Sequence, residues 1–108
     1  MTQAGEPTVG VVIPTRNAAR WLERTLAVLR EEPEPAEVLV IDSGSSDGTP
    51  EIAAREGARV VSIEPREFGH GRTRNLAMEL TEADLVCFLT QDAVPLPGWL
   101  GSWRPAFA

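Results

Sequence analysis

Three short polar clusters each follow an apolar run, and together they hold residue types that could bind a ligand. The clusters are Pro14-Thr15-Arg16-Asn17, Asp42-Ser43-Gly44 and Thr90-Gln91-Asp92. A buried strand has no structural need for a carboxylate at its end, so Asp42 and Asp92 are candidates for ligand contact. Carboxylates and hydroxyls that gather in one place can fix the orientation of a bound small molecule. We therefore treat the three clusters as one candidate site.

The second cluster continues into the small and polar residues Ser45 to Thr49. Part of this stretch has a purely structural explanation, because Asp47 can bond the local backbone and Thr49 can cap the helix that follows. Small residues there also let a flat ring or a phosphate approach the main chain closely. A turn does not require an acid at the end of a strand, so we expect Asp42 to contact a ligand.

Four apolar runs and three helical patterns must position these clusters. The strands are expected at 9–13, 38–41, 59–63 and 85–89, and the helices between Asn17 and Glu31, between Thr49 and Gly57, and at 73–80. Asn17 is expected to cap the first helix, and Pro33 prevents its continuation. This alternation predicts an α/β fold with a Rossmann-like, three-layer parallel sheet. All three clusters should then face one rim, beyond the carboxyl ends of the strands.

Composition limits the classes of function. The chain has 108 residues, of which 43% are apolar and 24% are charged, as expected for one small globular domain. The net charge of -6, without a basic stripe, argues against a nucleic-acid partner. Cys87 cannot form an internal disulfide and is interpreted as a small core residue, which fits a reducing, cytoplasmic setting. The first residues do not resemble a secretion signal, and no apolar run approaches the roughly 20 residues that span a bilayer.

Several common site motifs do not occur in the chain. It contains neither GxGxxG nor GxxxxGK[ST], so a dinucleotide-dependent oxidoreductase and a P-loop enzyme are not supported. One histidine and one cysteine cannot form a His/Cys metal cluster. A phosphoacceptor receiver would place paired acids after the first strand, where this chain has Pro14-Thr15-Arg16-Asn17.

Four segments, in order, resemble the nucleotide-sugar-binding half of a family 2 glycosyltransferase with the GT-A fold. They are VVIPTRN, VLVIDSGSSDGT, FGHGRTRN and FLTQDAVPLPGWL, and they cover nearly the whole chain from Val9 onward. The first two segments are widespread in that family. FGHGRTRN together with TQDA resembles the rhamnosyltransferase-like branch that builds bacterial surface polysaccharide.

The resemblance implies a set of contacts to the sugar donor. Pro14, Thr15 and Asn17 would shape the pocket for its base and ribose, and Asp42 would accept a hydrogen bond from the ring NH of uracil or thymine. Arg74 would lie against the base or the diphosphate. The residues implied as donor contacts are Pro14, Thr15, Asn17, Asp42, Ser43, Gly44, His70, Gly71, Arg74 and Gln91.

The resemblance also implies a divalent cation, Mg²⁺ or Mn²⁺, held by Asp92. Asp92 matches the last acid of the family's DxD motif, and such ions prefer oxygen ligands, often one or two carboxylates with phosphate and water. The ion would offset charge on the departing nucleoside diphosphate. Thr90 stands where the first Asp is common, so a weaker cation site is expected. The alternative for Asp92 is a structural cap of the turn before Pro97.

The segment FGHGRTRN contains a histidine and two arginines that need separate interpretations. His70 lies between two glycines, and it is either a ligand contact or a surface residue. A cation near a helix N-terminus is mildly unfavourable, and a bound diphosphate would offset that cost. We expect Arg74 to be the ligand contact and Arg72 to face solvent. Trp99 and Trp103 are expected on one face of a terminal helix.

The resemblance also determines the expected domain organisation. Residues 1–8 are interpreted as a tail and residues 9–108 as the donor-binding half of a GT-A domain, with the acceptor half and the catalytic base, usually an aspartate, beyond Ala108. The chain alone is therefore expected to be inactive, and its uncovered apolar surface would favour self-association.

The expected activity of the parent protein is inverting transfer of a sugar such as rhamnose. The donor would be a UDP- or dTDP-linked sugar and the acceptor a saccharide or a lipid-linked molecule. The alternative is a non-catalytic α/β module that binds a nucleotide or a protein partner. The expected location is the cytoplasm, with a peripheral place at the inner face of the membrane left open.

Overall fold

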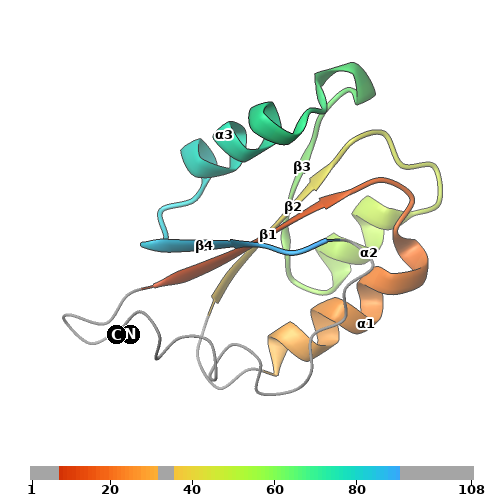
Figure 1. Cartoon of the computed structure of the whole chain (residues 1–108). Helices are drawn as coiled ribbons and strands as arrows, with labels where there is room; N and C mark the ends of the chain where they lie inside the picture. Colours follow the sequence, from red (N-terminus) through yellow and green to blue (C-terminus); the bar gives the residue numbers. More distant parts are fainter. Residues whose placement is uncertain (1–7, 32–35, 91–108) are drawn as a thin grey trace.

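The computed structural model describes residues 8–31 and 36–90, where the chain forms one sheet between two layers of helices (Figure 1). In chain order the elements are β1 (Val9–Thr15), α1 (Ala19–Arg30), β2 (Ala36–Asp42), α2 (Thr49–Arg55), β3 (Arg59–Ser62), the short 3₁₀ helix η1 (Pro65–Glu67), α3 (His70–Leu80) and β4 (Leu85–Phe88). The tail at residues 1–7 and the helix expected around Trp99 and Trp103 lie outside the described residues.

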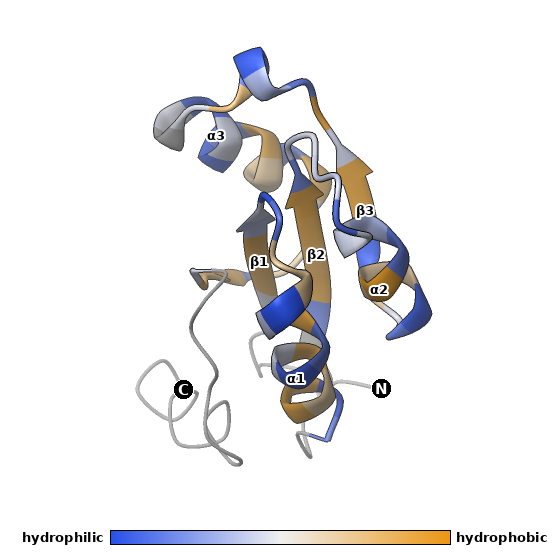
Figure 2. Ribbon diagram, turned by 90° about the vertical axis from the view of Figure 1, so that its right-hand side faces the viewer, coloured by the Kyte–Doolittle hydropathy of each residue, from blue (hydrophilic) through white to orange (hydrophobic). Residues whose placement is uncertain are grey.

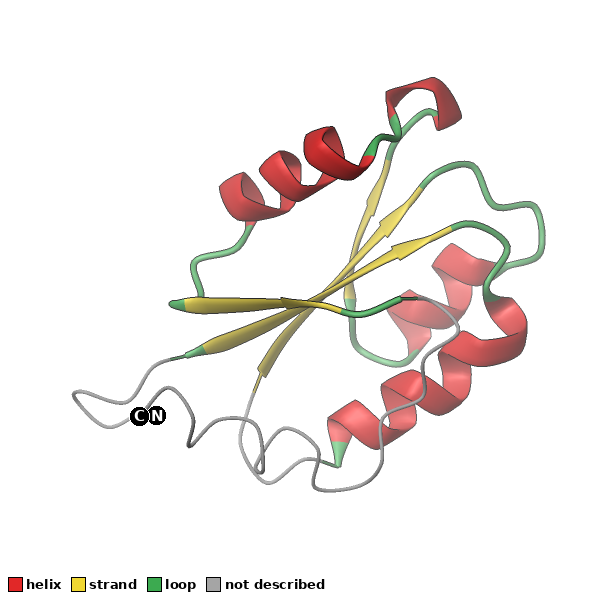
Figure 3. Ribbon diagram, viewed as in Figure 1, coloured by secondary structure: helices red, strands yellow, loops and turns green. Residues whose placement is uncertain are grey.

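The four strands are all parallel, in the order β3-β2-β1-β4. The chain moves outward from β1 to β3, and α3 then carries it back to β4 on the other side of β1. Helices α1 and α2 cover one face of the sheet and α3 covers the other (Figures 1 and 3). The predicted three-layer α/β fold is therefore confirmed. The direction of winding reverses between β1 and β4, and in such sheets ligands bind beyond the carboxyl ends of the strands at this point.

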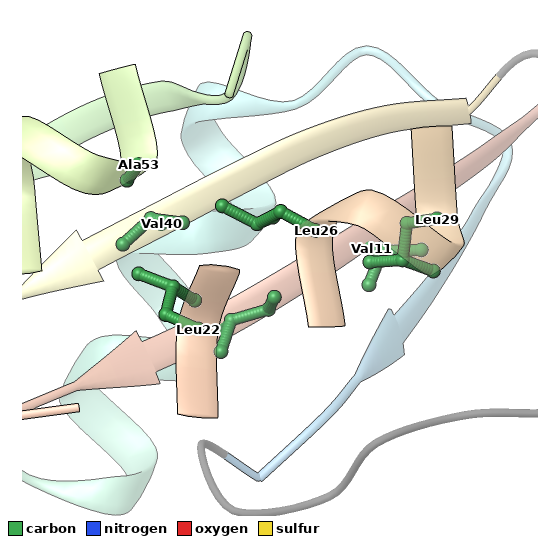
Figure 4. Packing of buried hydrophobic residues seen from close by; sticks show 7 residues of the cluster. Val11, Leu22, Leu26, Leu29, Val40 and Ala53 are labelled. Carbon is green, nitrogen blue, oxygen red and sulfur yellow. The ribbon is translucent and has the colours of Figure 1, made fainter. Parts of the chain in front are cut away.

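The core consists of two apolar layers, one on each face of the sheet. Val11, Ile13 and Val40 point toward α1 and α2, where they pack against Leu22, Leu26, Leu29 and Ala53 (Figure 4). Val12, Leu39 and Ile41 point the other way and pack with Ala77 of α3. Because both faces are covered, the central strands are apolar at nearly every position, as the hydropathy colouring of β1 and β2 shows (Figure 2).

Strand β1 is longer than expected, since it continues through Pro14 to Thr15 instead of stopping at Ile13. Proline lacks the N–H that a strand needs, but the missing donor costs nothing at this position. The N–H of Leu89 donates to the carbonyl of Val12, so that side of β1 faces β4. Pairing with β4 ends at Val12, and the same side of Pro14 has no ladder partner to lose.

Helix α3 also differs from its predicted bounds, because it begins at His70 and not at Thr73. The N–H of Thr73 donates to the carbonyl of Gly69 at 2.7 Å, which closes the first helical turn. Two glycines lie close to the helix start, and glycine has a low helix propensity. The sequence therefore did not predict that this turn is helical. Strand β3 ends at Ser62, one residue before the predicted end.

Within the described part of the chain, no helix combines the length and the apolar character that crossing a bilayer would require. Cys87 lies in β4 beside Val11, where it is half-buried. Burial raises the pKa of the Cys87 thiol, so the thiol stays protonated at neutral pH. The interpretation of Cys87 as a small packing residue agrees with this environment.

Candidate functional site

A pocket of about 510 Å³ lies at the carboxyl ends of β1, β2 and β4, where the direction of winding reverses. Its walls come from the loop after β1, the start of the loop after β2, η1, α3 and the end of β4. The lining residues are Pro14, Thr15, Arg16, Ser43, Pro65, Phe68, Thr73, Arg74, Phe88, Leu89 and Thr90. The pocket therefore occupies the rim at which the three polar clusters were expected to meet.

The structure brings four of the predicted contact residues to this pocket, namely Pro14, Thr15, Ser43 and Arg74. Asn17 and Gly44 belong to the loops after β1 and β2, and Asp42 ends β2, but none of the three lines the pocket. His70 and Gly71 belong to the first turn of α3, and Gly71 does not line the pocket. Gln91 and Asp92 lie outside the described residues, although Thr90 just before them lines the pocket.

The carboxylate of Asp42 holds the loop that follows its own strand. Asp42 is only 2% exposed, and it accepts hydrogen bonds from the hydroxyl of Thr15 at 2.8 Å and the N–H of Ser45 at 3.0 Å. The hydroxyl of Ser45 also donates to it. A carboxylate offers about four acceptor positions, and protein donors use three here. The acid therefore has a structural role at the strand end, and its contact with a ligand base stays a prediction.

Asn17 does not cap α1 as the sequence predicted. Its backbone is left-handed, with φ of 53°, and its N–H donates to the hydroxyl of Ser45 at 2.8 Å. Its side-chain oxygen accepts the N–H of Ser46 at 2.8 Å. Asn17 thus fastens the loop after β1 to the loop after β2. Asparagine tolerates this backbone conformation better than most residues, which explains its place at this turn.

The N-terminus of α1 is capped instead by side chains of the loop after β2. The N–H of Ala18 donates to the hydroxyl oxygen of Thr49 at 2.9 Å, and the N–H of Ala19 donates to Asp47 at 3.0 Å. Thr49 was expected to cap α2, but the N-cap there is Gly48, at φ of 87°. The Thr49 hydroxyl bonds the Asp47 carboxylate, and this bond, with further bonds from the N–H groups of Ala19 and Thr49, lowers the pKa of Asp47.

Gly44 allows η1 to approach the loop after β2. Its φ is +83°, and a Cβ atom placed on it would lie 2.8 Å from Cγ of Pro65. Any larger residue would be strained in its backbone and would collide with Pro65. The sequence predicted that small residues in this loop let a ligand approach the main chain. In the structure the ring of Pro65 fills the space beside Gly44.

The pocket lining is positively charged and contains no acid among the residues that the structure describes. Arg16 and Arg74 both line it, in a chain whose net charge is -6. The guanidinium of Arg74 lies 5.0 Å from the ring centre of Phe88, a cation–π distance. Arg72, expected to face solvent, is exposed and lines a separate hollow beside η1. A pocket with this charge suits an anionic ligand.

Sequence reasoning missed most of the apolar wall of the pocket. Pro65, Phe68, Phe88 and Leu89 were assigned to strands or loops without a binding role, although Phe68 begins one of the four family segments. Phe68 could have been identified as a pocket residue from its position at the start of FGHGRTRN. The other three residues could not be identified from local sequence pattern, because their role depends on how α3 returns the chain to β4.

The described residues offer hydroxyl oxygens for a hard cation but no cluster of acids. No group of three or more His, Cys, Asp or Glu side chains comes together in residues 8–31 and 36–90. Ser43 and Thr90 provide oxygen atoms at the pocket, the donor type that Mg²⁺ and Mn²⁺ prefer. A cation would need a carboxylate as well, and the predicted one, Asp92, lies outside the described residues.

Comparison with known proteins agrees with this geometry. The family model for glycosyl transferase family 2 matches residues 10–105. The O-antigen chain rhamnosyltransferase WbaN of Salmonella anatum is 42% identical over 91 residues, which are 82% of this chain and 29% of the relative. The O-antigen chain rhamnosyltransferase RfbN of Salmonella typhimurium is 38% identical over 89 residues, or 80% of this chain and 28% of the relative.

A solved structure shares the fold. Glucosyl-3-phosphoglycerate synthase from Mycobacterium tuberculosis, in complex with Mn²⁺, UDP and glucosyl-3-phosphoglycerate, superimposes with a TM-score of 0.75 at 30% identity. The match covers 91% of this chain and 38% of that protein. The chain thus spans less than a third of the two rhamnosyltransferases and just over a third of the synthase. The chain belongs to glycosyltransferase family 2, with the GT-A fold and a rhamnosyltransferase-like sequence.

Proposed function

We propose that this region binds the nucleotide-diphosphate-sugar donor of an inverting glycosyltransferase. The observation that carries the proposal is the pocket at the reversal of winding, lined by Arg16 and Arg74 and by no described acid, in a chain of net charge -6. The rhamnosyltransferase relatives and the UDP-containing structure support the same ligand class. The parent protein would transfer a sugar such as rhamnose to a polysaccharide or a lipid-linked acceptor.

The proposed role of the two arginines is to bind the diphosphate and to stabilise it as a leaving group. Guanidinium groups pair well with phosphate oxygens, and preorganised cations lower the free energy of a developing negative charge. Phe88 holds the guanidinium of Arg74 in place before the ligand arrives. Thr15 and Ser43, at the ends of β1 and β2, would provide polar contacts at the same pocket.

A divalent cation is part of the proposal, with Asp92 as its carboxylate ligand and Thr90 nearby. When bound, Mg²⁺ or Mn²⁺ would neutralise charge on the departing nucleoside diphosphate. The presence of Mn²⁺ with UDP in the related synthase supports such a cation without deciding between the two metals.

No described residue is proposed as the catalytic base. Asp42 and Asp47 both accept several hydrogen bonds from protein groups, so neither carboxylate is available to an acceptor hydroxyl. The base and the acceptor site are proposed to belong to the rest of the parent protein. A cytoplasmic location is part of the proposal, and it is supported by the single unpaired cysteine.

Calorimetric titration of the chain with UDP and dTDP, with and without Mg²⁺ or Mn²⁺, tests the proposal. We expect binding, and we expect Arg74→Ala to weaken it by about tenfold or more, because a hydrogen bond between charged groups contributes roughly 1.5–3 kcal/mol. Arg24→Ala is the matched control, since Arg24 is exposed on α1 away from the pocket. Absence of binding by the folded chain to either nucleotide would refute the proposal. Binding without transfer by the full-length parent would favour the non-catalytic module.

A further inference from the structure

We infer that Ser45 is a positioning residue for the pocket, because its hydroxyl group connects the buried carboxylate of Asp42 to the main chain beside Arg16. Ser45 does not itself line the pocket, so the role assigned to it needs no contact with a ligand. The inference rests on the proposed function, since it is through Arg16 and an anionic ligand that Ser45 would act.

The main chain of Arg16 is held on both sides by hydrogen bonds that lead to the same carboxylate. On one side, the hydroxyl of Thr15 donates directly to Asp42 at 2.8 Å. On the other side, the N–H of Asn17 donates to the hydroxyl of Ser45 at 2.8 Å, and that hydroxyl donates to Asp42. The N–H of Ser45 donates to the second oxygen of the same acid at 3.0 Å. Arg16 therefore extends to the pocket from between two residues whose positions depend on one buried acid.

The connection needs a side-chain group that donates and accepts a hydrogen bond at the same position. The group at residue 45 accepts the N–H of Asn17 while it donates to a carboxylate, which a serine or threonine hydroxyl can do and an alanine cannot. The bond also supports an uncommon conformation, because φ of Asn17 is 53°, in the left-handed region that is costly for most residues other than glycine. Loss of the hydroxyl should therefore let this turn relax and shift the main chain of Arg16.

Arg16 and Arg74 line the same pocket but are positioned by different means. The guanidinium of Arg74 lies 5.0 Å from the ring centre of Phe88, so a side-chain contact orients it. For Arg16, the connection from Asp42 through Ser45 fixes the main chain from which the side chain extends. A ligand binds more tightly when the groups that contact it are ordered in advance, because less conformational freedom is lost on binding. Ser45 thus contributes to anion binding without touching the anion.

Calorimetric titration of UDP into variants of the chain tests the inference. Ser45→Ala should weaken UDP binding by roughly three- to tenfold, the equivalent of one hydrogen bond, while Ser45→Thr keeps the hydroxyl and should bind within about twofold of the wild-type chain. Ser46→Ala is the matched control. It removes an exposed neighbouring hydroxyl whose bond to Asn17 is long, at 3.4 Å, and it keeps the Ser46 N–H that donates to Asn17 at 2.8 Å. Each titration is made well below the unfolding temperature of the variant.

A double-mutant cycle separates the positioning of Arg16 from a general loss of structure. Arg16→Ala alone should weaken UDP binding by about tenfold, because a charged partner of the diphosphate is lost. Adding Ser45→Ala to this variant should cause no further loss, since the residue that Ser45 positions is already gone. A merely structural role would give losses that multiply.

Two results would overturn the inference while UDP binding by the wild-type chain leaves the proposed function intact. One is unchanged affinity of the folded Ser45→Ala variant, and the other is a double variant in which the two losses multiply. A wild-type chain that binds no nucleotide would overturn both the inference and the proposed function.

Discussion

The loops after β1 and β2 differ from the wall built by η1, α3 and β4 in how they contribute to the same pocket. The two loops are fastened to each other by hydrogen bonds that side-chain oxygens accept, namely those of Asp42, Asn17, Asp47 and Thr49. The other wall contributes Pro65, two aromatic rings and Arg74, whose guanidinium lies over Phe88. On the first side most of the bonded polar side chains thus serve as scaffold, although Arg16 and Ser43 also line the pocket. On the other side the lining is mainly apolar, with Arg74 as its cation.

Polar residues near a site are commonly expected to contact the ligand, but several of those in the two loops are bonded to other protein groups. Asp42 is nearly fully buried and bonded to its own protein, so it has a structural role, and its contact with a ligand stays a prediction. The sequence places Phe68 in a loop without a binding role, but in the structure it lines the pocket. Substitutions of the hydrogen-bonded scaffold residues of the two loops should therefore act first on stability, and substitutions in the wall should act first on binding. The following predictions test that division.

The largest effect on stability is expected for Asp42→Ala. The change removes the acceptor of the buried Thr15 hydroxyl and of the Ser45 N–H, and unsatisfied buried donors cost roughly 1–3 kcal/mol each. We expect the free energy of unfolding in urea to fall by about 2–4 kcal/mol. Asp42→Asn keeps one oxygen acceptor and should lose less. Equal stability of the wild type and Asp42→Ala would show that the carboxylate is not part of the scaffold.

A smaller fall in the free energy of unfolding, about 2 kcal/mol, is expected for Gly44→Ala. The added Cβ is strained in the left-handed backbone of this residue and collides with Pro65. Because η1 must then shift, nucleotide binding should weaken as well. Gly71→Ala is the control, since a Cβ there meets nothing within 4 Å and lies in a helix. This control should be neutral or slightly stabilising in thermal unfolding. A fully stable Gly44→Ala variant would refute the tight contact between the two sides.

The contribution of Asp47 should appear as a pH dependence. Its pKa is lowered in the folded chain from the ordinary value of 3.8, so the ionised carboxylate stabilises the fold above that value. The contribution should disappear as the pH falls below about 4 and through the folded-state pKa. Urea unfolding between pH 3 and pH 7 should show this loss in the wild type and not in Asp47→Asn. Identical pH profiles would contradict the capping role of this side chain.

The smallest effect on stability is expected in the wall, for Phe88→Leu. The substitution keeps most of the apolar volume and removes the ring under Arg74, which contributes roughly 0.5–1 kcal/mol at such exposure. The free energy of unfolding should fall by about 1 kcal/mol, while affinity for UDP falls because Arg74 is no longer held. If stability fell as much as in Asp42→Ala, the two sides would not differ as described.

The sequence alone determined the architecture and the rim at which the site lies. Apolar periodicity is a local property, and strict alternation of strand and helix leaves few topologies other than a parallel sheet covered on both faces. Parallel strands send their carboxyl ends to one edge, so Pro14, Thr15 and Ser43 had to gather there.

Only the tertiary structure decided which of these residues face the pocket and which hold the scaffold. Helix α1 is capped by Thr49 and Asp47, about thirty residues further along the chain, in place of the adjacent Asn17. Phe68 and Phe88 come to one pocket only because α3 returns the chain to the other side of β1. The physical reason is that hydrogen bonds and packing between loops depend on distances in space, and no local pattern of residue types records those distances.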